Sequence, residues 1–169
     1  MVARMPRACM RFVLLAVLGI VAVGCGKEIG DECVVSTDCA TDGTRSCDSS
    51  SRGGYCTIQG CDFDTCPEEA ACIRFFTGNF ANRDCNPASE DRGTDDCSLD
   101  ELCSLVGKCV PRSSEVRYCM RTCGDDSDCR DGYECRDQTL MVEHGGEPVL
   151  APGGLVTESS VKFCASQPP

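Results

Sequence analysis

Long apolar runs are confined to the N-terminal end of this sequence. Residues 12–23 read FVLLAVLGIVAV without a charge, and residues 1–11 carry three arginines and no acid. A helix of that length spans about 18 Å, whereas the apolar core of a bilayer is roughly 30 Å thick. A basic stretch before a short apolar run is typical of a secretory signal peptide. We expect residues 1–24 to be such a signal, with an uncleaved membrane anchor as the alternative.

Beyond this run, hydrophobic and polar positions predict only sparse regular structure. Residues 73–77 are predicted to form a strand that enters a turn at Gly78-Asn79, with Phe80 on the returning strand. Pro67, followed by acids, predicts one short helix over 64–72. Strands are predicted near 139–142 and 160–164, around a Gly/Pro-rich loop that Cys164 is expected to close. The expected fold is small, disulfide-rich and mostly irregular, with short β-hairpins and one short helix.

The composition explains why crosslinks are expected to hold this fold. The chain has no Trp, few Phe and Tyr, and 18 Cys, so it cannot build a large apolar core and should depend on metal or disulfides. Structural zinc sites usually contain Cys-x2-Cys pairs or Cys/His sets. The sequence has no Cys-x2-Cys, its common spacing is Cys-x5-Cys, and its only histidine is His144. Disulfides in an oxidising compartment are therefore favoured, and no metal or cofactor is predicted.

The residues after the apolar run indicate the type of signal peptide. Ala22-Val23-Gly24-Cys25 resembles the bacterial lipobox, although Ala stands where Leu is commonest. The resemblance implies cleavage between Gly24 and Cys25 and acylation of Cys25, which would anchor the protein in a membrane. An ordinary signal that happens to precede a cysteine is the alternative. Without Cys9 and Cys25 an even sixteen cysteines remain, able to form eight disulfides: Cys33, Cys39, Cys47, Cys56, Cys61, Cys66, Cys72, Cys85, Cys97, Cys103, Cys109, Cys119, Cys123, Cys129, Cys135 and Cys164.

The cysteine pattern is repetitive. Cys-x3-[Ser/Thr]-Asp-Cys occurs at residues 33–39 and 123–129, and each copy is followed by Gly-Tyr shortly before another cysteine. We expect these residues to serve turns and short strands. Related units are predicted near 33–61, 61–85, 97–109 and 119–164. The domain organisation would then be a tether at 25–32, an N-terminal lobe at 33–85, a polar linker at 86–96, a C-terminal lobe at 97–164 and a tail at 165–169.

This arrangement resembles the cysteine-rich outer-membrane lipoproteins that are numerous in myxobacteria and related bacteria. Its spacing is also loosely similar to EGF-like and Dickkopf-type N-terminal modules. The resemblance implies a location at the cell envelope, and Gly26 in place of Asp after the acylated cysteine favours the outer membrane. The formal charge is −11, or about −14 without residues 1–24. This acidity argues against nucleic acid as a partner and against electrostatic docking on anionic lipid.

The sequence offers little catalytic chemistry, and no catalytic residue is predicted. The acids at 125–134 do not match an EF-hand frame, because Arg130 stands at a ligand position and Gly132 is one place late. His144 is expected in a surface loop, without a nucleophile motif. The favoured function is a lipid-anchored structural or binding module that presents loops such as 136–163 to a protein or glycan. A secreted-type enzyme or inhibitor on the same scaffold is the alternative.

Overall fold

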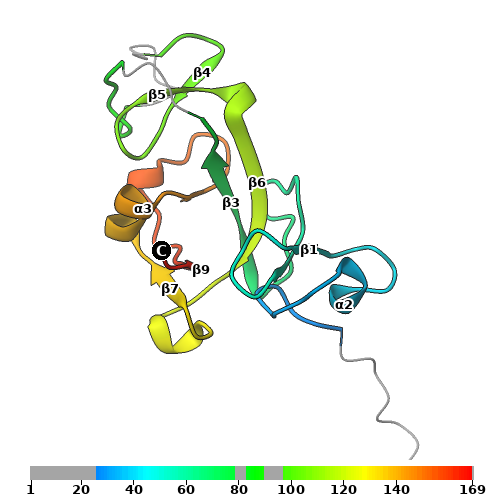
Figure 1. The fold of residues 1–169 in the computed structure, drawn as a ribbon. Coiled ribbons are helices and arrows are strands. Elements are labelled where there is room, and N and C mark those ends of the chain that lie inside the picture. The colour runs from blue at the N-terminus through cyan, green and yellow to red at the C-terminus, as the bar shows by residue number, and fades with distance from the viewer. Residues whose placement is uncertain (1–25, 79–82, 90–96, 169) are drawn as a thin grey trace, which may run out of the picture.

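The computed structural model describes residues 26–78, 83–89 and 97–168 (Figure 1). The predicted signal peptide, Cys25, the predicted return at Phe80 and most of the predicted linker lie outside the described residues. The described chain is a disulfide-rich fold of short antiparallel ladders with few helices, which confirms the expected fold class.

The largest sheet has three antiparallel strands in the order β6-β3-β8. Strand β3 (Ala70–Phe76) pairs along its whole length with β6 (Glu115–Arg121), and its other edge pairs with the short β8 (Glu147–Pro148). The predicted strand at 73–77 is thus confirmed, but it begins earlier and replaces the predicted helix over 64–72. The reason is tertiary: only a hydrogen-bonded turn follows Pro67, since the Ala70 amide donates to the Pro67 carbonyl (2.9 Å), and β6 then pairs with the chain from Ala70 onward.

Three two-stranded ladders surround this sheet. Strand β1 (Ser46–Asp48) pairs with β2 (Tyr55–Thr57), and β4 (Glu101–Cys103) pairs with β5 (Cys109–Pro111). Strand β7 (Tyr133–Arg136) pairs with β9 (Phe163–Ser166), which overlaps the strand predicted near 160–164. Because β9 continues to Ser166 and Ala165 is buried, the predicted tail begins inside a strand.

The helices are short. They are α2 (Ser36–Cys39) and α3 (Gln138–His144), together with 3-10 turns at Arg112–Ser114, Asp126–Asp128 and Val156–Glu158. Helix α3 shows that the strand predicted near 139–142 was wrong. The Asp137 carboxylate caps the helix by accepting from the amides of Thr139 (3.0 Å) and Leu140 (3.1 Å), and Met141 is the buried residue on its inner face. Capping and a single apolar contact therefore favour the helix.

The sixteen predicted cysteines form eight disulfides with one repeated connectivity. Taken in chain order, each set of four cysteines pairs its first with its third and its second with its fourth. The pairs are Cys33–Cys47 and Cys39–Cys56 (first unit), Cys61–Cys72 and Cys66–Cys119 (second unit), Cys85–Cys103 and Cys97–Cys109 (third unit), and Cys123–Cys135 and Cys129–Cys164 (fourth unit).

Every unit also places its third and fourth cysteines opposite each other on paired strands. Cys47 faces Cys56, and Cys135 faces Cys164, yet each of these residues bonds to an earlier cysteine instead of to its neighbour across the ladder. The same holds in the second and third units. A ladder of three or four residues is marginal by itself. Two interlocked crosslinks tie each ladder to the chain that precedes it.

The third unit is inserted into the second. It occupies the chain between Cys72 and Cys119, the third and fourth cysteines of the second unit. The predicted grouping was therefore wrong for Cys85, which belongs with 97–109, and for Cys119, which belongs with 61–72. The β3–β6 ladder and the Cys66–Cys119 bond join the two predicted lobes. In Figure 1 the β4–β5 ladder lies at one end of the molecule, and the N-terminal end of the described chain lies beside α2 at the other.

The segment before the first disulfide is part of the folded body. Ile29 is fully buried in the main apolar core. The Gly30 amide donates to the Cys56 carbonyl, and the Cys56 amide donates to the Asp31 carbonyl, both at 2.9 Å. The tether predicted at 25–32 is therefore part of the folded body from Lys27 onward. The added pairing with the β2 edge and the burial of one large side chain explain the difference.

An aromatic stack joins the first and fourth units. Tyr55 and Tyr133 lie with ring centroids 5.5 Å apart, and the Arg130 guanidinium lies 4.1 Å from the Tyr133 centroid. Both tyrosines come from the repeated Gly-Tyr pairs. Gly54 has φ +69°, and a Cβ there would lie 1.9 Å from the Cys33 carbonyl oxygen, so the turn before Tyr55 requires glycine.

Candidate functional site

The predicted cleavage and lipidation site, Gly24-Cys25, lies outside the described residues. It directly precedes Gly26, which is exposed. Lys27 is already fixed to the folded body, because its carbonyl accepts from the Arg45 guanidinium and its ammonium donates to the Glu32 carbonyl (2.6 Å). Two fully extended residues reach about 7 Å. A lipid on Cys25 would therefore leave the folded body very close to the membrane surface.

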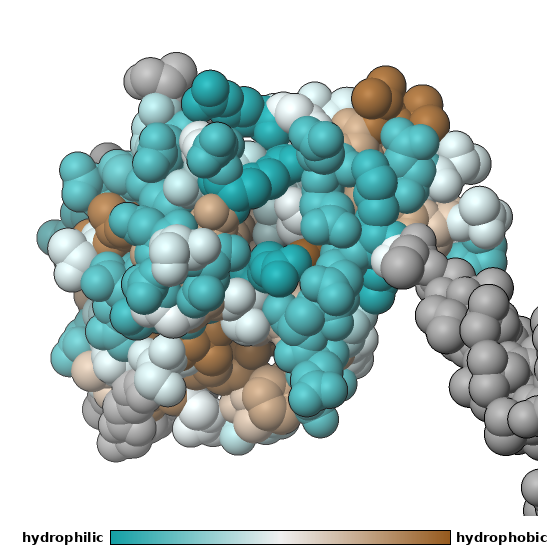
Figure 2. Space-filling model, turned by 90° about the horizontal axis from the view of Figure 1, so that it is seen from below, coloured by the Kyte–Doolittle hydropathy of each residue, from teal (hydrophilic) through white to brown (hydrophobic). Residues whose placement is uncertain are grey.

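A groove lies beside the loop 148–156. This loop, together with Phe63, Arg74, Arg112 and Arg117, encloses about 560 Å³. A neighbouring hollow of about 510 Å³ shares Arg112 and Arg117 and continues along β6. Figure 2 shows one face of the molecule, where hydrophobic patches are separated by a largely hydrophilic surface. The predicted contact region 136–163 also lines a smaller hollow of about 270 Å³ beside Met141 and His144.

The loop is held at both ends. At its start the Val149 amide donates to the Cys72 carbonyl of β3 (2.8 Å). Near its end the Gln138 side-chain amide donates to the carbonyls of Val156 (3.2 Å), Thr157 (2.9 Å) and Ser159 (3.0 Å). Residues 151–154 between them are exposed. The groove thus has a fixed frame with an exposed rim, which suits recognition by a pre-formed loop.

The groove carries both signs of charge. Arg117 pairs with Asp62 (2.9 Å) and also with Glu115. Arg74 donates to the nearly buried Glu147 at 3.0 Å. Arg112 is exposed and forms no ion pair with a described residue. Since most of its cations are already neutralised, the groove is a mixed polar and apolar surface and not an anion site.

Glu147 fastens the third unit to the central sheet. One of its oxygens accepts from Arg74, and the other accepts from the Leu105 amide at 2.7 Å. Burial raises the pKa of Glu147 above its ordinary value, although Arg74 and the Leu105 amide act in the opposite direction. Because Arg74 belongs to β3 and Leu105 follows β4, this carboxylate sets how the inserted unit stands on the sheet.

His144 was predicted to lie in a surface loop, but it is the last residue of helix α3. Its Nδ1 lies 2.7 Å from an oxygen of the buried Glu134, which also accepts from Arg136 (2.8 Å). Arg136 further donates to the carbonyls of His144 and Gly145, each at 2.9 Å. The other ring nitrogen lies 3.7 Å from Glu143. The described partners of His144 are carboxylates, and the network closes the end of α3 against β7.

The acidic stretch after Cys123 forms a hydrogen-bonded turn. Asp125 accepts from the amide (2.8 Å) and hydroxyl (2.5 Å) of Ser127, and these bonds lower the pKa of Asp125. Asp126 accepts from the Cys135 amide (2.8 Å), and Asp128 accepts from the Gly124 amide (2.7 Å). Each acid therefore serves the backbone of its own unit, as the turn interpretation predicts.

The same device occurs in the first unit. Asp38 accepts from the amides of Val34 (2.8 Å) and Val35 (3.1 Å), as Asp128 does from residues 124 and 125. The hydrogen bond from the Val34 amide has the largest effect in lowering the pKa of Asp38. The aspartate of the repeated Cys-x3-[Ser/Thr]-Asp-Cys pattern is thus a structural acceptor in both copies.

Metal ligation would require free thiolates, and the cysteine clusters are instead bonded. In each unit three sulfur atoms lie within 4.8 Å of one another, a separation that could suit a metal. All of them take part in the disulfides described above. The clusters result from interlocked disulfides.

The residues that join the units were not predicted from the sequence. Arg130 donates to the Arg52 carbonyl (2.9 Å) and contacts the Gly54 carbonyl and the Tyr133 hydroxyl. The Tyr55 hydroxyl donates to the Cys164 carbonyl (3.2 Å). The repeated Gly-Tyr was the available signal, because two copies of one motif can pack against each other. Nothing in the sequence indicated Arg130 or Glu147.

Comparisons with models of protein families, with curated proteins and with solved structures gave no match. Among the residues that the structure describes, no helix has both the length and the apolar character needed to cross a bilayer. The candidate site is therefore defined by its own geometry: a framed groove beside the loop 148–156, on a crosslinked body that begins two residues after Cys25.

Proposed function

We propose that this chain is a lipid-anchored, extracytoplasmic lipoprotein of the cell envelope, which acts as a structural or binding module at the outer membrane. The observation that carries the proposal is that all sixteen cysteines after Cys25 are paired in disulfides. Such pairing requires an oxidising compartment. Cys25, behind a lipobox-like sequence, is then the one cysteine of the exported chain that these eight disulfides do not use.

The anchor is tested by intact-mass analysis of protein extracted from membranes. We expect loss of residues 1–24, added acyl mass on Cys25, no alkylation before reduction and sixteen alkylated thiols after it. A Cys25→Ser variant should leave the membrane fraction. Wild-type protein without acyl mass, or a Cys25→Ser variant that stays in the membrane fraction, would contradict the anchor.

The binding role is supported by the framed groove beside the loop 148–156. Its exposed rim, its apolar side chains and Arg112, which has no ion pair with a described residue, suit a protein or glycan surface better than a small buried substrate. A photo-crosslinking residue at Leu150, which lines the groove, should give adducts on intact cells. The matched control is the same residue at the fully exposed Leu99 of the third unit. Equal adducts at both positions would argue against a specific site.

A further inference from the structure

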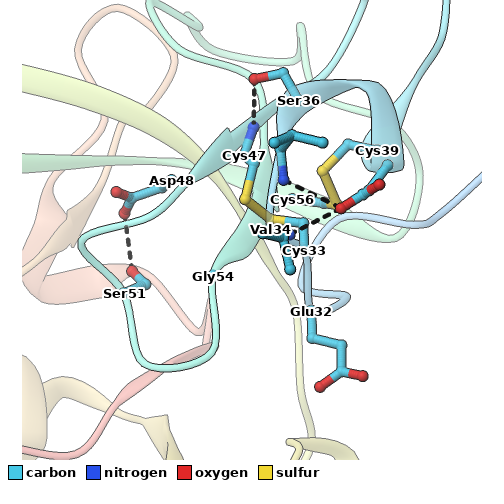
Figure 3. The surroundings of a disulfide bond; sticks show 12 residues. Glu32, Cys33, Val34, Ser36, Cys39, Cys47, Asp48, Ser51, Gly54 and Cys56 are labelled. Carbon is cyan, nitrogen blue, oxygen red and sulfur yellow. Dashed lines mark hydrogen bonds between the residues drawn. A yellow bond between two sulfur atoms is a disulfide. The ribbon is translucent and has the colours of Figure 1, made fainter.

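Two exposed valines stand at the turn that opens the first unit. Val34 is 83% exposed and Val35 is 53% exposed. They are followed by Ser36 and Thr37, so the tip of this turn carries no charge, although a quarter of the chain is charged. Asp38 directs a carboxylate oxygen back to the two valine amides. Figure 3 shows Val34 beside the Cys33–Cys47 and Cys39–Cys56 disulfides.

The fold does not require valine at these positions. The fourth unit builds the same turn with Gly124 and Asp125, whose amides donate to Asp128 at 2.7 and 3.3 Å. Its tip is exposed and acidic. Since one backbone device accepts either pair of residues, the apolar pair in the first unit reflects what surrounds it and not how it folds.

The position of the valines relative to Cys25 indicates what surrounds them. Only Gly26 separates Cys25 from Lys27, which is fixed to the body by Arg45 and Glu32. The described chain begins beside α2, and the β4–β5 ladder lies at the opposite end (Figure 1). If Cys25 is acylated, as the proposed function holds, Lys27 lies within about 7 Å of Cys25, so the folded body is held next to the headgroups at this end.

We infer that Val34 and Val35 insert into the boundary between headgroups and acyl chains of the anchoring membrane. This inference rests on the proposed lipid anchor and adds a defined orientation to it. The contact is apolar, because a body of about −14 charge gains nothing from anionic headgroups. The anchor alone would let the body rotate about Gly26. A second, apolar contact fixes the first unit against the membrane and directs the third unit away from it.

Tryptophan reporters test this orientation, because the chain contains no Trp of its own. The full acylated protein carrying Val34→Trp would be placed in vesicles of phosphatidylcholine and phosphatidylethanolamine with brominated acyl chains. We expect blue-shifted emission and about twofold or greater quenching by the brominated lipid. The control is Leu99→Trp in the third unit, where the native residue is fully exposed. Its emission should be unshifted and unquenched.

A second variant separates insertion from folding. Val34→Gly with Val35→Asp gives the turn the residues of the fourth unit, so its disulfides should still form. With Thr37→Trp as the reporter, quenching should be present beside the two valines and lost in the exchanged turn. An exchanged turn that quenches as strongly as the native one would overturn the inference.

The remaining outcomes are distinct. Acyl mass on Cys25 together with unquenched Val34→Trp would overturn the docking and leave the anchor intact. Absence of acyl mass would overturn the anchor, and the docking with it. A blue shift that grows with protein concentration but is insensitive to brominated lipid would show contact between copies of the chain, which also overturns the membrane contact.

Discussion

Removal of the Cys66–Cys119 disulfide is expected to damage this protein more than removal of a disulfide that closes a short loop. The bond spans 53 residues, joins the two predicted lobes and ends at Cys119 in β6, directly opposite Cys72 in β3. A Cys66→Ala/Cys119→Ala double variant removes it without leaving a free thiol. The third unit would then be held to the body by the β3–β6 ladder, the contacts of Glu147 and the packing of Leu105 against the main core.

The magnitude follows from chain entropy. Within the span of 53 residues, the Cys85–Cys103 bond bridges 18, so the effective loop is about 36 residues. A loop of that size corresponds to about 4 kcal/mol of unfolding free energy. The Cys97–Cys109 bond spans only 12 residues and corresponds to about 3 kcal/mol. This bond lies within the third unit, so its loss should destabilise that unit more than the rest of the protein.

Urea unfolding without reductant, followed by circular dichroism, measures both variants. Amide hydrogen exchange then locates the change. We expect Cys66→Ala/Cys119→Ala to lose more stability and to expose the β3–β6 amides, whereas Cys97→Ala/Cys109→Ala should affect mainly the third unit. If the variant of the short loop were the less stable one, or if β3–β6 kept full protection in the other, the assignment of the central crosslink would be refuted.

Three further predictions concern local packing and charge. Ile29→Ala should lower the free energy of unfolding by about 2–5 kcal/mol, because the side chain is fully buried. The control Val142→Ala, at an exposed position of α3, should change it by less than about 0.5 kcal/mol. Equal urea midpoints would contradict a packed N-terminal segment. Arg130→Met should cost about 2 kcal/mol through loss of its bonds to carbonyls and its contact with Tyr133, and an unchanged midpoint would count against the stack. Hydrogen bonds from the Val34 and Val35 amides lower the pKa of Asp38, so its contribution to the unfolding free energy is present above the unfolded pKa of about 4 and is lost as the pH falls through the folded pKa. Urea midpoints from pH 6 to pH 3 should therefore fall less steeply for Asp38→Asn than for the wild type. Identical slopes would exclude this role.

The sequence alone determined how this protein is stabilised. An aromatic-poor chain with eighteen cysteines, one histidine and no Cys-x2-Cys cannot rely on a large core or on zinc, and the structure pairs every cysteine after Cys25. The apolar pattern also located the central strand near 73–77, and the repeated Asp-Cys and Gly-Tyr motifs indicated turns. These properties are local, because composition and neighbouring residues suffice to set them.

Only the tertiary structure decided which distant segments meet. Spacing cannot show that Cys66 pairs with Cys119 across an inserted unit, since a disulfide depends on the separation of two residues in space. The stretch 64–72 had helix signals, but pairing with β6 made its end a strand. A cap at Asp137 made 138–144 a helix where a strand near 139–142 was predicted. The segment before Cys33 was predicted to be a tether, but it hydrogen-bonds to β2 and buries Ile29 in the core. For the stretch 64–72 and the segment before Cys33, long-range pairing or burial outweighed a weak local preference. For 138–144 a local helix cap did so, together with the burial of Met141.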